Sequence, residues 1–273
     1  MKNKSNPCTL HQEFTTLFCD MMNLLRFCIV RTYLGMRYFF HWMTRTGCFG
    51  PGQARHMTPS PELFKGPGLP AALFRHHVKQ YHESSCSVAS VVCVVNVLRE
   101  RFKCPGPPIT QQAILDKVRT AHWKERMEPG GYKGRRGLPL AVLTQVVEDS
   151  LRAYDLPFKK VEMIQGPLAQ GATRFRQQIL GCLKNFQSLD KCLIIAHFDQ
   201  GAFIKELNIP HISPVGGFDL STDVVTILDV DPDQKLPYRI SFDRFYKGIS
   251  IPYAGVFKPF GYERGGIVVI HLT

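Results

Sequence analysis

The sequence QYHESSCSVASVVCVVNVL at residues 80–98 decides most of what can be predicted about this chain. From Val88 to Leu98 it is almost wholly apolar and rich in valine, and local propensity alone favours a β-strand for such a run. Its length, with Ser84 and Ser85 directly before it, also fits a helix capped by one of the two serines. The pattern leaves strand and helix open.

Cys86 lies at the point where that helix would begin. The unpaired N–H groups of a helix N-terminus favour a thiolate, which is the nucleophilic form of cysteine. A single cysteine is more often a small buried hydrophobe, so position rather than residue type makes Cys86 a candidate nucleophile. Cys93, two turns further along the same face, is expected to pack in the core.

A thiolate nucleophile needs a base and a group that orients the base. His211, in IPHISPVGG at residues 209–217, lies at the edge of a predicted strand, and the two glycines after it leave room for a ligand or another backbone. Asp229 ends a predicted strand, where its carboxylate could accept the imidazole N–H and fix the tautomer. Gln80 could join the backbone N–H of Cys86 in binding a tetrahedral oxyanion. Taken alone, each residue also has a structural interpretation: a core histidine, a turn aspartate and a solvated glutamine.

Residues 69–273 are expected to form the body of the protein. Helical spacing comes first in this region and apolar strand-like runs come later, without the strand–helix alternation that builds a parallel sheet. This order predicts an α+β fold. The expected helices are residues 138–153 and 173–186, and the expected strands are residues 191–198, 212–218, 224–230, 239–242 and 266–272.

Residues 1–46 are predicted to form an N-terminal amphipathic, basic helix, regular over residues 13–45. Nearly all its strongly polar side chains fall within about 140° of a helical wheel. Three interpretations stay open: packing on the body or on a second copy in a homodimer, a helix on a membrane surface, and an inserted anchor. The longest charge-free stretch is far shorter than the roughly 20 apolar residues that span a bilayer, and charges interrupt any signal-peptide core. Residues 47–68, rich in glycine and proline, are predicted to be a linker.

Composition narrows the class of protein. The chain has 273 residues, 44% of them apolar, and a formal net charge of +12, which excludes a disordered chain, a collagen-like repeat and a small disulfide scaffold. Residues 137–273 hold equal numbers of basic and acidic residues, so the whole excess lies in the first half. That excess favours an anionic partner: a small acidic substrate, a lipid surface or nucleic acid. No recognition helix or aromatic-interleaved basic strand accompanies it, so no nucleic acid is expected.

The nine cysteines are odd in number and form no CxxC pair, so zinc-ribbon and thioredoxin-like sites have no spacing to support them. Several lie in apolar runs, which favours a reducing, cytoplasmic location, with membrane association if residues 13–45 bind lipid. His76, His77 and the scattered cysteines lack the spacing of metal ligands. We therefore expect no tightly bound ion or cofactor, and residues for a metal stay unknown.

Three segments in order resemble the phytochelatin synthase family. Residues 80–98 are similar to the nucleophile segment of that family, and HISPVGGFD at residues 211–219, followed by VTILDV at residues 225–230, is similar to its His and Asp segments. The resemblance covers roughly residues 70–250. Each segment alone is weakly specific, whereas the three together are fairly specific.

The resemblance implies a papain-like cysteine protease fold, in which a helix bearing the Cys packs on an antiparallel sheet carrying His and Asp. It implies an acyltransferase or hydrolase that cleaves the Cys–Gly bond of glutathione or a related γ-glutamyl thiol peptide. The γ-glutamylcysteinyl group passes to a second glutathione, giving a phytochelatin, or to water. By this resemblance Cys86 is the nucleophile, His211 the base, Asp229 the orienting group and Gln80 the oxyanion donor. Cd, Zn or Cu ions are implied as activators or as thiolate complexes of the substrate.

The chain departs from the family at three positions. Ser87 and Pro210 stand where the family usually has glycine, and Pro232 stands where it has an arginine that helps to bind substrate. Basic residues in the loop KGRR at residues 133–136 could supply a replacement charge, although a solvated loop explains them equally well. Two other functions therefore stay open: a papain-like cysteine peptidase acting on another peptide or protein amide, and a non-enzymatic binding module on the same scaffold.

Overall fold

Seven antiparallel strands form the sheet of the computed structural model, which describes residues 7–44, 55–166, 172–204 and 209–273. The strand order is β1-β6-β5-β4-β3-β7-β2, and every neighbouring pair is antiparallel. Strand β3 is buried at every position, so it is covered on both faces. The strands are β1 (Arg55–His56), β2 (Lys160–Gln165), β3 (Cys192–Asp199), β4 (Pro210–Asp219), β5 (Val224–Ile227), β6 (Tyr238–Ser241) and β7 (Gly266–His271).

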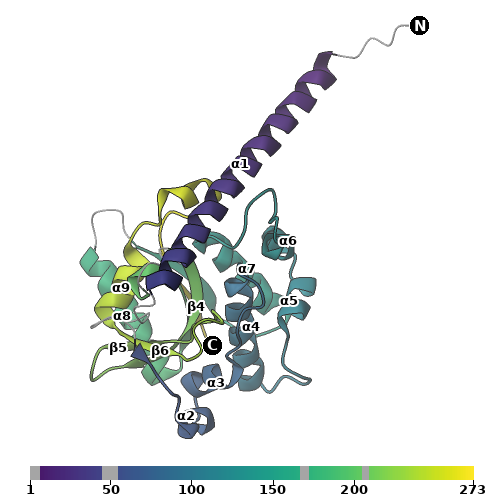
Figure 1. Ribbon diagram of the computed structural model, residues 1–273. Helices are drawn as coiled ribbons and strands as arrows, with labels where there is room; N and C mark the ends of the chain where they lie inside the picture. The colour runs from purple at the N-terminus through teal and green to yellow at the C-terminus, as the bar shows by residue number, and fades with distance from the viewer. Residues whose placement is uncertain (1–6, 45–54, 167–171, 205–208) are drawn as a thin grey trace.

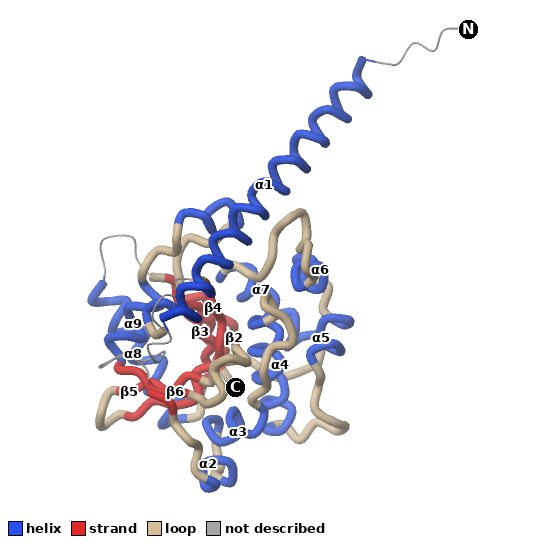
Figure 2. The backbone as a smooth tube through the Cα atoms, viewed as in Figure 1, coloured by secondary structure: helices blue, strands red, loops and turns tan. Residues whose placement is uncertain are grey.

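Helices lie on both sides of this sheet. Figure 2 shows the strands between α4 and α7 on one side and α8 and α9 on the other, and α4 contacts β4 while α8 and α9 both contact β3. The α-helices are α1 (Pro7–Thr44), α2 (Pro61–Lys65), α3 (Leu69–His76), α4 (Cys86–Arg101), α5 (Gln111–Lys117), α6 (Trp123–Met127), α7 (Leu140–Ala153), α8 (Ala172–Leu189) and α9 (Phe242–Ser250); short 3-10 turns are η1 (Thr120–His122), η2 (Gln200–Ala202) and η3 (Gly255–Phe260).

The valine-rich run is helical, and it forms α4. Every residue from Cys86 to Leu98 is buried, because α3, α5, α7 and β4 all pack against this helix. The surrounding elements provide apolar contacts for all its faces, and this burial outweighs the preference of valine for strands. Tertiary packing thus resolves the ambiguity that the sequence left open.

The segregation of helices and antiparallel strands agrees with the predicted α+β class. The helices expected at residues 138–153 and 173–186 are α7 and α8, and the five expected strands correspond to β3, β4, β5, β6 and β7. No sequence pattern predicted β2, which pairs along its whole length with β7. The range predicted to be a linker lies partly outside the described residues, but its described part contains α2 and the edge strand β1, which pairs with β6.

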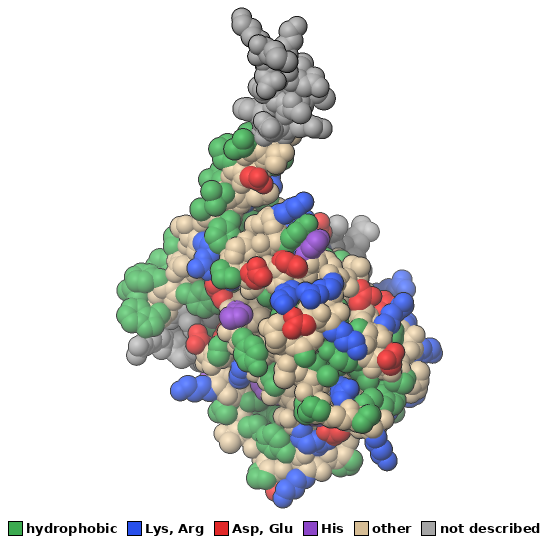
Figure 3. Space-filling model, turned by 90° about the vertical axis from the view of Figure 1, so that its right-hand side faces the viewer, with side chains coloured by type: hydrophobic (Ala, Val, Ile, Leu, Met, Phe, Trp, Pro, Cys, Tyr) green, Lys and Arg blue, Asp and Glu red, His purple; other side chains and the backbone are tan. Residues whose placement is uncertain are grey.

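Helix α1 has two apolar faces in different surroundings. In Figure 1 its C-terminal half crosses the body near β4, and its N-terminal half stands clear of the body. The inward face packs on a small aromatic cluster around η3. The outward face is bare, and Figure 3 shows hydrophobic side chains on the protruding part; its large exposed residues are Leu17, Phe18, Met21, Leu24, Leu25, Ile29, Met36, Phe39, Phe40, Trp42 and Met43.

Among the described helices, none combines the length and apolarity needed to cross a membrane. Packing of α1 on the body agrees with one of the three predicted interpretations. Contact of the bare outward face with a membrane surface or a second copy of the chain stays a prediction.

Candidate active site

Cys86 is the first residue of α4 and lines a cavity of about 110 Å³ together with Gln80 and His211. Cys86 is only 8% exposed and belongs to the hydrophobic core cluster, yet it also lines this cavity. Ser85 occupies the helix N-cap as expected, but its hydroxyl bonds to the backbone of His82 instead of capping α4. The thiol therefore lies at a helix N-terminus, where the helix dipole favours a negative charge.

His211 connects the thiol to a carboxylate. It is the second residue of β4 and is almost fully buried. Its Nε2 lies 2.7 Å from Oδ1 of Asp229, which leaves Nδ1 for the hydrogen bond with Cys86. Burial lowers the pKa of His211, but the Asp229 carboxylate and the contact with Cys86 outweigh burial and hold that pKa well above its usual range. The imidazolium form is thus stabilised beside the thiol.

The carboxylate of Asp229 is fully buried and well supplied with donors. Besides the ring of His211, it accepts hydrogen bonds from the Tyr238 hydroxyl at 2.7 Å and from the backbone N–H of Asp231 at 2.9 Å. Burial raises the pKa of Asp229, but His211 and these donors outweigh burial and keep that pKa below its usual range. The carboxylate therefore stays ionised and orients the imidazole.

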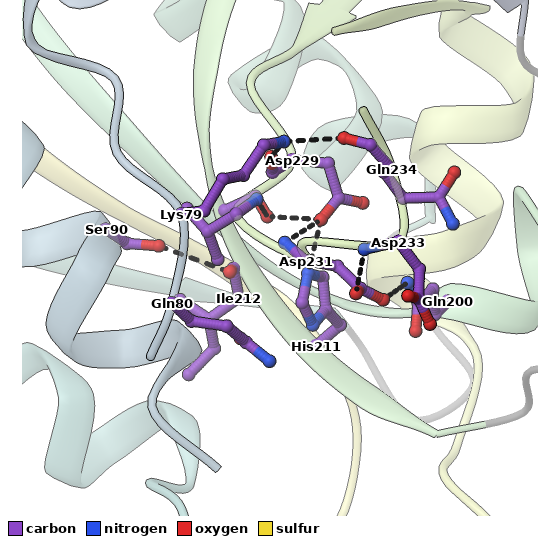
Figure 4. Close-up of polar contacts among 12 residues, drawn as sticks. Lys79, Gln80, Ser90, Gln200, His211, Ile212, Asp229, Asp231, Asp233 and Gln234 are labelled. Carbon is purple, nitrogen blue, oxygen red and sulfur yellow. Dashed lines mark hydrogen bonds and ion pairs between the residues drawn. The ribbon is translucent and has the colours of Figure 1, made fainter. Parts of the chain in front are cut away.

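Two further side chains hold the backbone of Asp229. Nζ of Lys79 donates to the carbonyl oxygens of Asp229 at 2.5 Å and of Gln234 at 2.6 Å, and Nε2 of His77 lies 3.0 Å from the Asp229 carbonyl. Figure 4 shows Lys79 reaching this backbone while His211 lies on the carboxylate side. Burial and the nearby charge of Lys79 lower the pKa of His77 to about 4, so it is neutral. Sequence reasoning missed Lys79, His77 and Tyr238, because no motif links them to Asp229.

Gln80 lines the same cavity as Cys86. Its backbone N–H donates to the carbonyl of Val230 at 2.8 Å, which fixes the segment next to the Asp229 turn. Its side-chain Nε2 has a long contact of 3.4 Å with the Glu83 carbonyl, and its Oε1 is buried with no partner among the described residues. A donor with so weak a bond can turn to an oxyanion at little cost. All four residues singled out from the sequence therefore meet at one site.

The three departures from the family pattern have different surroundings. The hydroxyl of Ser87 accepts a hydrogen bond from the indole N–H of buried Trp123 at 3.1 Å, so it serves the core. Pro210 begins β4 and lines the cavity. Pro232 is exposed in a turn and does not line the cavity. From the loop at residues 133–136, Arg136 does line it.

The space predicted beside the glycine pair at residues 216–217 is filled by the protein itself. A Cβ on Gly216 would lie 2.6 Å from the side chain of Leu228. Glycine is required there because Leu228 packs against the bulged backbone between Val215 and Gly217. The expectation of room for a ligand at this point is wrong.

Within the described ranges, no group of three or more His, Cys, Asp or Glu side chains is arranged to hold a metal ion. The expectations that no ion is tightly bound and that soft metals act through glutathione stay predictions.

This arrangement can support nucleophilic chemistry on an acyl group. The thiol can give its proton to His211, the imidazolium can give a proton to a leaving amine, and the amide of Gln80 can stabilise an oxyanion. A sulfur, an imidazole and a carboxylate in a row supply the nucleophile, the base and the orienting group for such a reaction.

The comparisons with known proteins agree with this chemistry. The family model described as phytochelatin synthase matches residues 70–254, which include Cys86, His211 and Asp229. A search of curated proteins finds no match to the chain. Since the model covers more than half of the sequence, the chain belongs to the phytochelatin synthase family, whose members are transferases with glutathione as substrate.

Proposed function

We propose that the chain is a glutathione γ-glutamylcysteinyltransferase that works through an acyl-enzyme on Cys86. The contact of Cys86 with His211, and of His211 with buried Asp229, supports this proposal more than any other observation. We further propose that residues 69–273 form a papain-like catalytic domain, since a helix bearing the nucleophile packs on the antiparallel sheet that carries the base.

In the first half-reaction the Cys86 thiolate attacks the carbonyl carbon of the Cys–Gly amide of glutathione. Gln80 Nε2 and the backbone N–H of Cys86 stabilise the oxyanion. The C–N bond then breaks, the imidazolium of His211 gives its proton to the leaving nitrogen, and glycine departs. A γ-glutamylcysteinyl thioester remains on Cys86.

In the second half-reaction His211 accepts a proton from the incoming nucleophile, which attacks the thioester carbonyl. When the nucleophile is the α-amine of a second glutathione, the product is a phytochelatin. When it is water, the product is γ-glutamylcysteine. Soft metal ions enter this scheme bound to the thiol of glutathione, as part of the substrate.

Mass spectrometry of products formed from glutathione tests the proposal. We expect γ-glutamylcysteine, glycine and longer thiol peptides, and we expect Cys86→Ala to lower the rate by roughly 10⁴-fold or more. Cys104→Ala is the matched control, because Cys104 is a free thiol outside the cavity lining. Product formation that survives Cys86→Ala would rule out the acyl-enzyme.

The peptidase alternative makes a different prediction. An acyl-amide probe would label Cys86 while glutathione stayed inert and did not slow the labelling. That result would replace glutathione with another amide and leave the three-residue mechanism intact.

A further inference from the structure

Helix α1 forms one wall of the active-site cavity, although it lies outside the matched residues 70–254. Val30, Leu34 and Tyr38 from its inward face pack on the aromatic cluster beneath it, and the rings of Tyr33 and Phe257 meet edge to face at 5.5 Å. This packing fixes the register of α1 over the site. The residues of α1 that line the cavity are Phe27, Val30, Arg31, Leu34 and Tyr38.

One end of the cavity carries surplus positive charge. Nη1 of Arg31 lies 2.6 Å and Nη1 of Arg136 lies 3.2 Å from the same oxygen of Glu83. Arg136 also donates to the Ser84 hydroxyl at 3.2 Å, and its Nε is buried with no partner among the described residues. Two guanidinium groups thus share one carboxylate. This end of the cavity therefore keeps a net positive charge, which a ligand carboxylate could neutralise.

The cavity also contains a buried negative group. Asp231 is 6% exposed and lines the cavity. Its hydrogen-bond donors are the uncharged amide of Gln200 at 3.3 Å and the backbone N–H of Asp233 at 3.0 Å. Burial and the nearby charge of Asp229 raise the pKa of Asp231, and the opposing effect of His211 and the two hydrogen bonds is smaller. A cationic group of a ligand would offset both effects.

The two charged places come from different segments of the chain. Glu83, which Arg31 contacts, lies just before α4, whereas Asp231 follows Asp229 between β5 and β6. Arg31 and Tyr38 both line the cavity from α1. Residues seven apart on a helix lie on the same side and about 10 Å from each other. Cys86 and His211 line the same cavity, so a substrate that reaches both places lies across the thiol.

We propose that Arg31 of α1 and Arg136 bind the glycine carboxylate of the acyl donor, and that Asp231 binds its γ-glutamyl ammonium group. This inference rests on the proposed function and names the residues that orient its substrate. From the γ-glutamyl Cα to the glycine carboxylate, extended glutathione has the backbone bonds of about three residues, or roughly 10 Å. The glycine carboxylate and the γ-glutamyl ammonium group match the signs of these cavity-lining charges, and the length of the ligand matches the stretch of α1 from Arg31 to Tyr38.

Charged thiol reagents test the subsites without glutathione. The probes are methanethiosulfonates with a sulfonate or a trimethylammonium group, and mass spectrometry follows modification of the Cys86 peptide. We expect Arg31→Gln and Arg136→Gln to lower the sulfonate rate relative to the ammonium rate by about tenfold, and Asp231→Asn to change the ratio in the opposite sense. Arg31→Lys should restore most of the ratio, which separates loss of charge from displacement of α1.

Arg26→Gln is the matched control for Arg31, since Arg26 is an exposed arginine of the same helix that does not line the cavity. A ratio that Arg31→Gln and Arg26→Gln change equally would contradict the subsite, because it would reflect only the general charge of α1.

Steady-state kinetics with three substrates complete the test: glutathione, its glycine carboxamide and its N-acetyl derivative. Arg31→Gln should raise KM for glutathione about tenfold and leave KM for the carboxamide unchanged. Asp231→Asn should likewise raise KM for glutathione about tenfold and leave KM for the N-acetyl derivative unchanged. Turnover of glutathione with KM indifferent to these variants overturns the inference and leaves the proposed function standing. Predicted probe ratios in a protein that does not turn over glutathione overturn the proposed function and support the subsites for another zwitterionic peptide.

Discussion

Helices α4 and α1 differ in how much of their surface the protein covers. Helix α4 is buried on every face over Cys86 to Leu98, whereas α1 packs with one face and leaves a long apolar face bare. The nucleophile therefore sits on a helix that the core holds rigidly, and one wall of the cavity comes from a helix with few packed contacts. Local stability follows such packing, so we expect the chemistry and the substrate wall to respond differently to mutation.

A charge placed in each helix tests this comparison most severely. Val95→Asp puts a carboxylate at a fully buried position of α4 and should lower the free energy of unfolding by at least about 4 kcal/mol. Leu25→Asp in α1, where the side chain is 53% exposed, should change it by less than about 0.5 kcal/mol. Denaturant titration measures both. Equal losses would mean that the outward face of α1 is covered in solution.

Removing the oxyanion donor should affect chemistry and leave the fold intact. We expect Gln80→Leu to lower kcat by roughly 10²- to 10³-fold, with the free energy of unfolding nearly unchanged because Gln80 is held mainly through its backbone. Gln112→Leu, at an exposed position of α5, serves as the control. A loss below about fivefold in kcat would show that Gln80 has only a structural role in its loop and does not stabilise the oxyanion.

The catalytic residues were easier to predict from the sequence than the residues that hold them in place. Cys86, His211 and Asp229 could be placed from segments that resemble a known family, and the length of the valine-rich run allowed α4. Tyr238, Lys79 and His77 could not be foreseen, because their bonds to Asp229 arise from strand pairing and loop packing that leave no local pattern. The cavity-lining role of Arg31 was equally hidden, since the position of α1 depends on contacts with residues more than 200 positions away, around η3.

The pair formed by His211 and Asp229 makes a pH-dependent prediction. The pKa of His211 is raised, so its contribution to stability is present below the unfolded value near 6.5 and is lost as pH rises through the folded pKa. The pKa of Asp229 is lowered, so its contribution is present above the unfolded value near 3.9 and is lost as pH falls through the folded pKa.

Asp229→Asn should therefore move the His211 titration to lower pH, which NMR of the imidazole C–H signals can follow. It should cost most stability between pH of about 4 and the folded pKa of His211. An unchanged titration of His211 would show that the carboxylate does not set its charge.

The smallest effects are expected on the bare face of α1. Leu25→Gln and Phe39→Gln should leave kcat/KM for glutathione within about twofold, because both side chains are exposed and neither lines the cavity. The same variants test the membrane interpretation. Flotation of the native chain with anionic vesicles, lost in the double variant, would support a lipid-binding face, and no flotation of either protein would reject it.

The central claim is that Cys86 carries the acyl group. Acid quenching during turnover of glutathione, followed by peptide mapping, measures it directly. We predict a γ-glutamylcysteinyl adduct on the peptide that contains Cys86. Turnover without an adduct, or with the adduct on a different cysteine, would contradict the account.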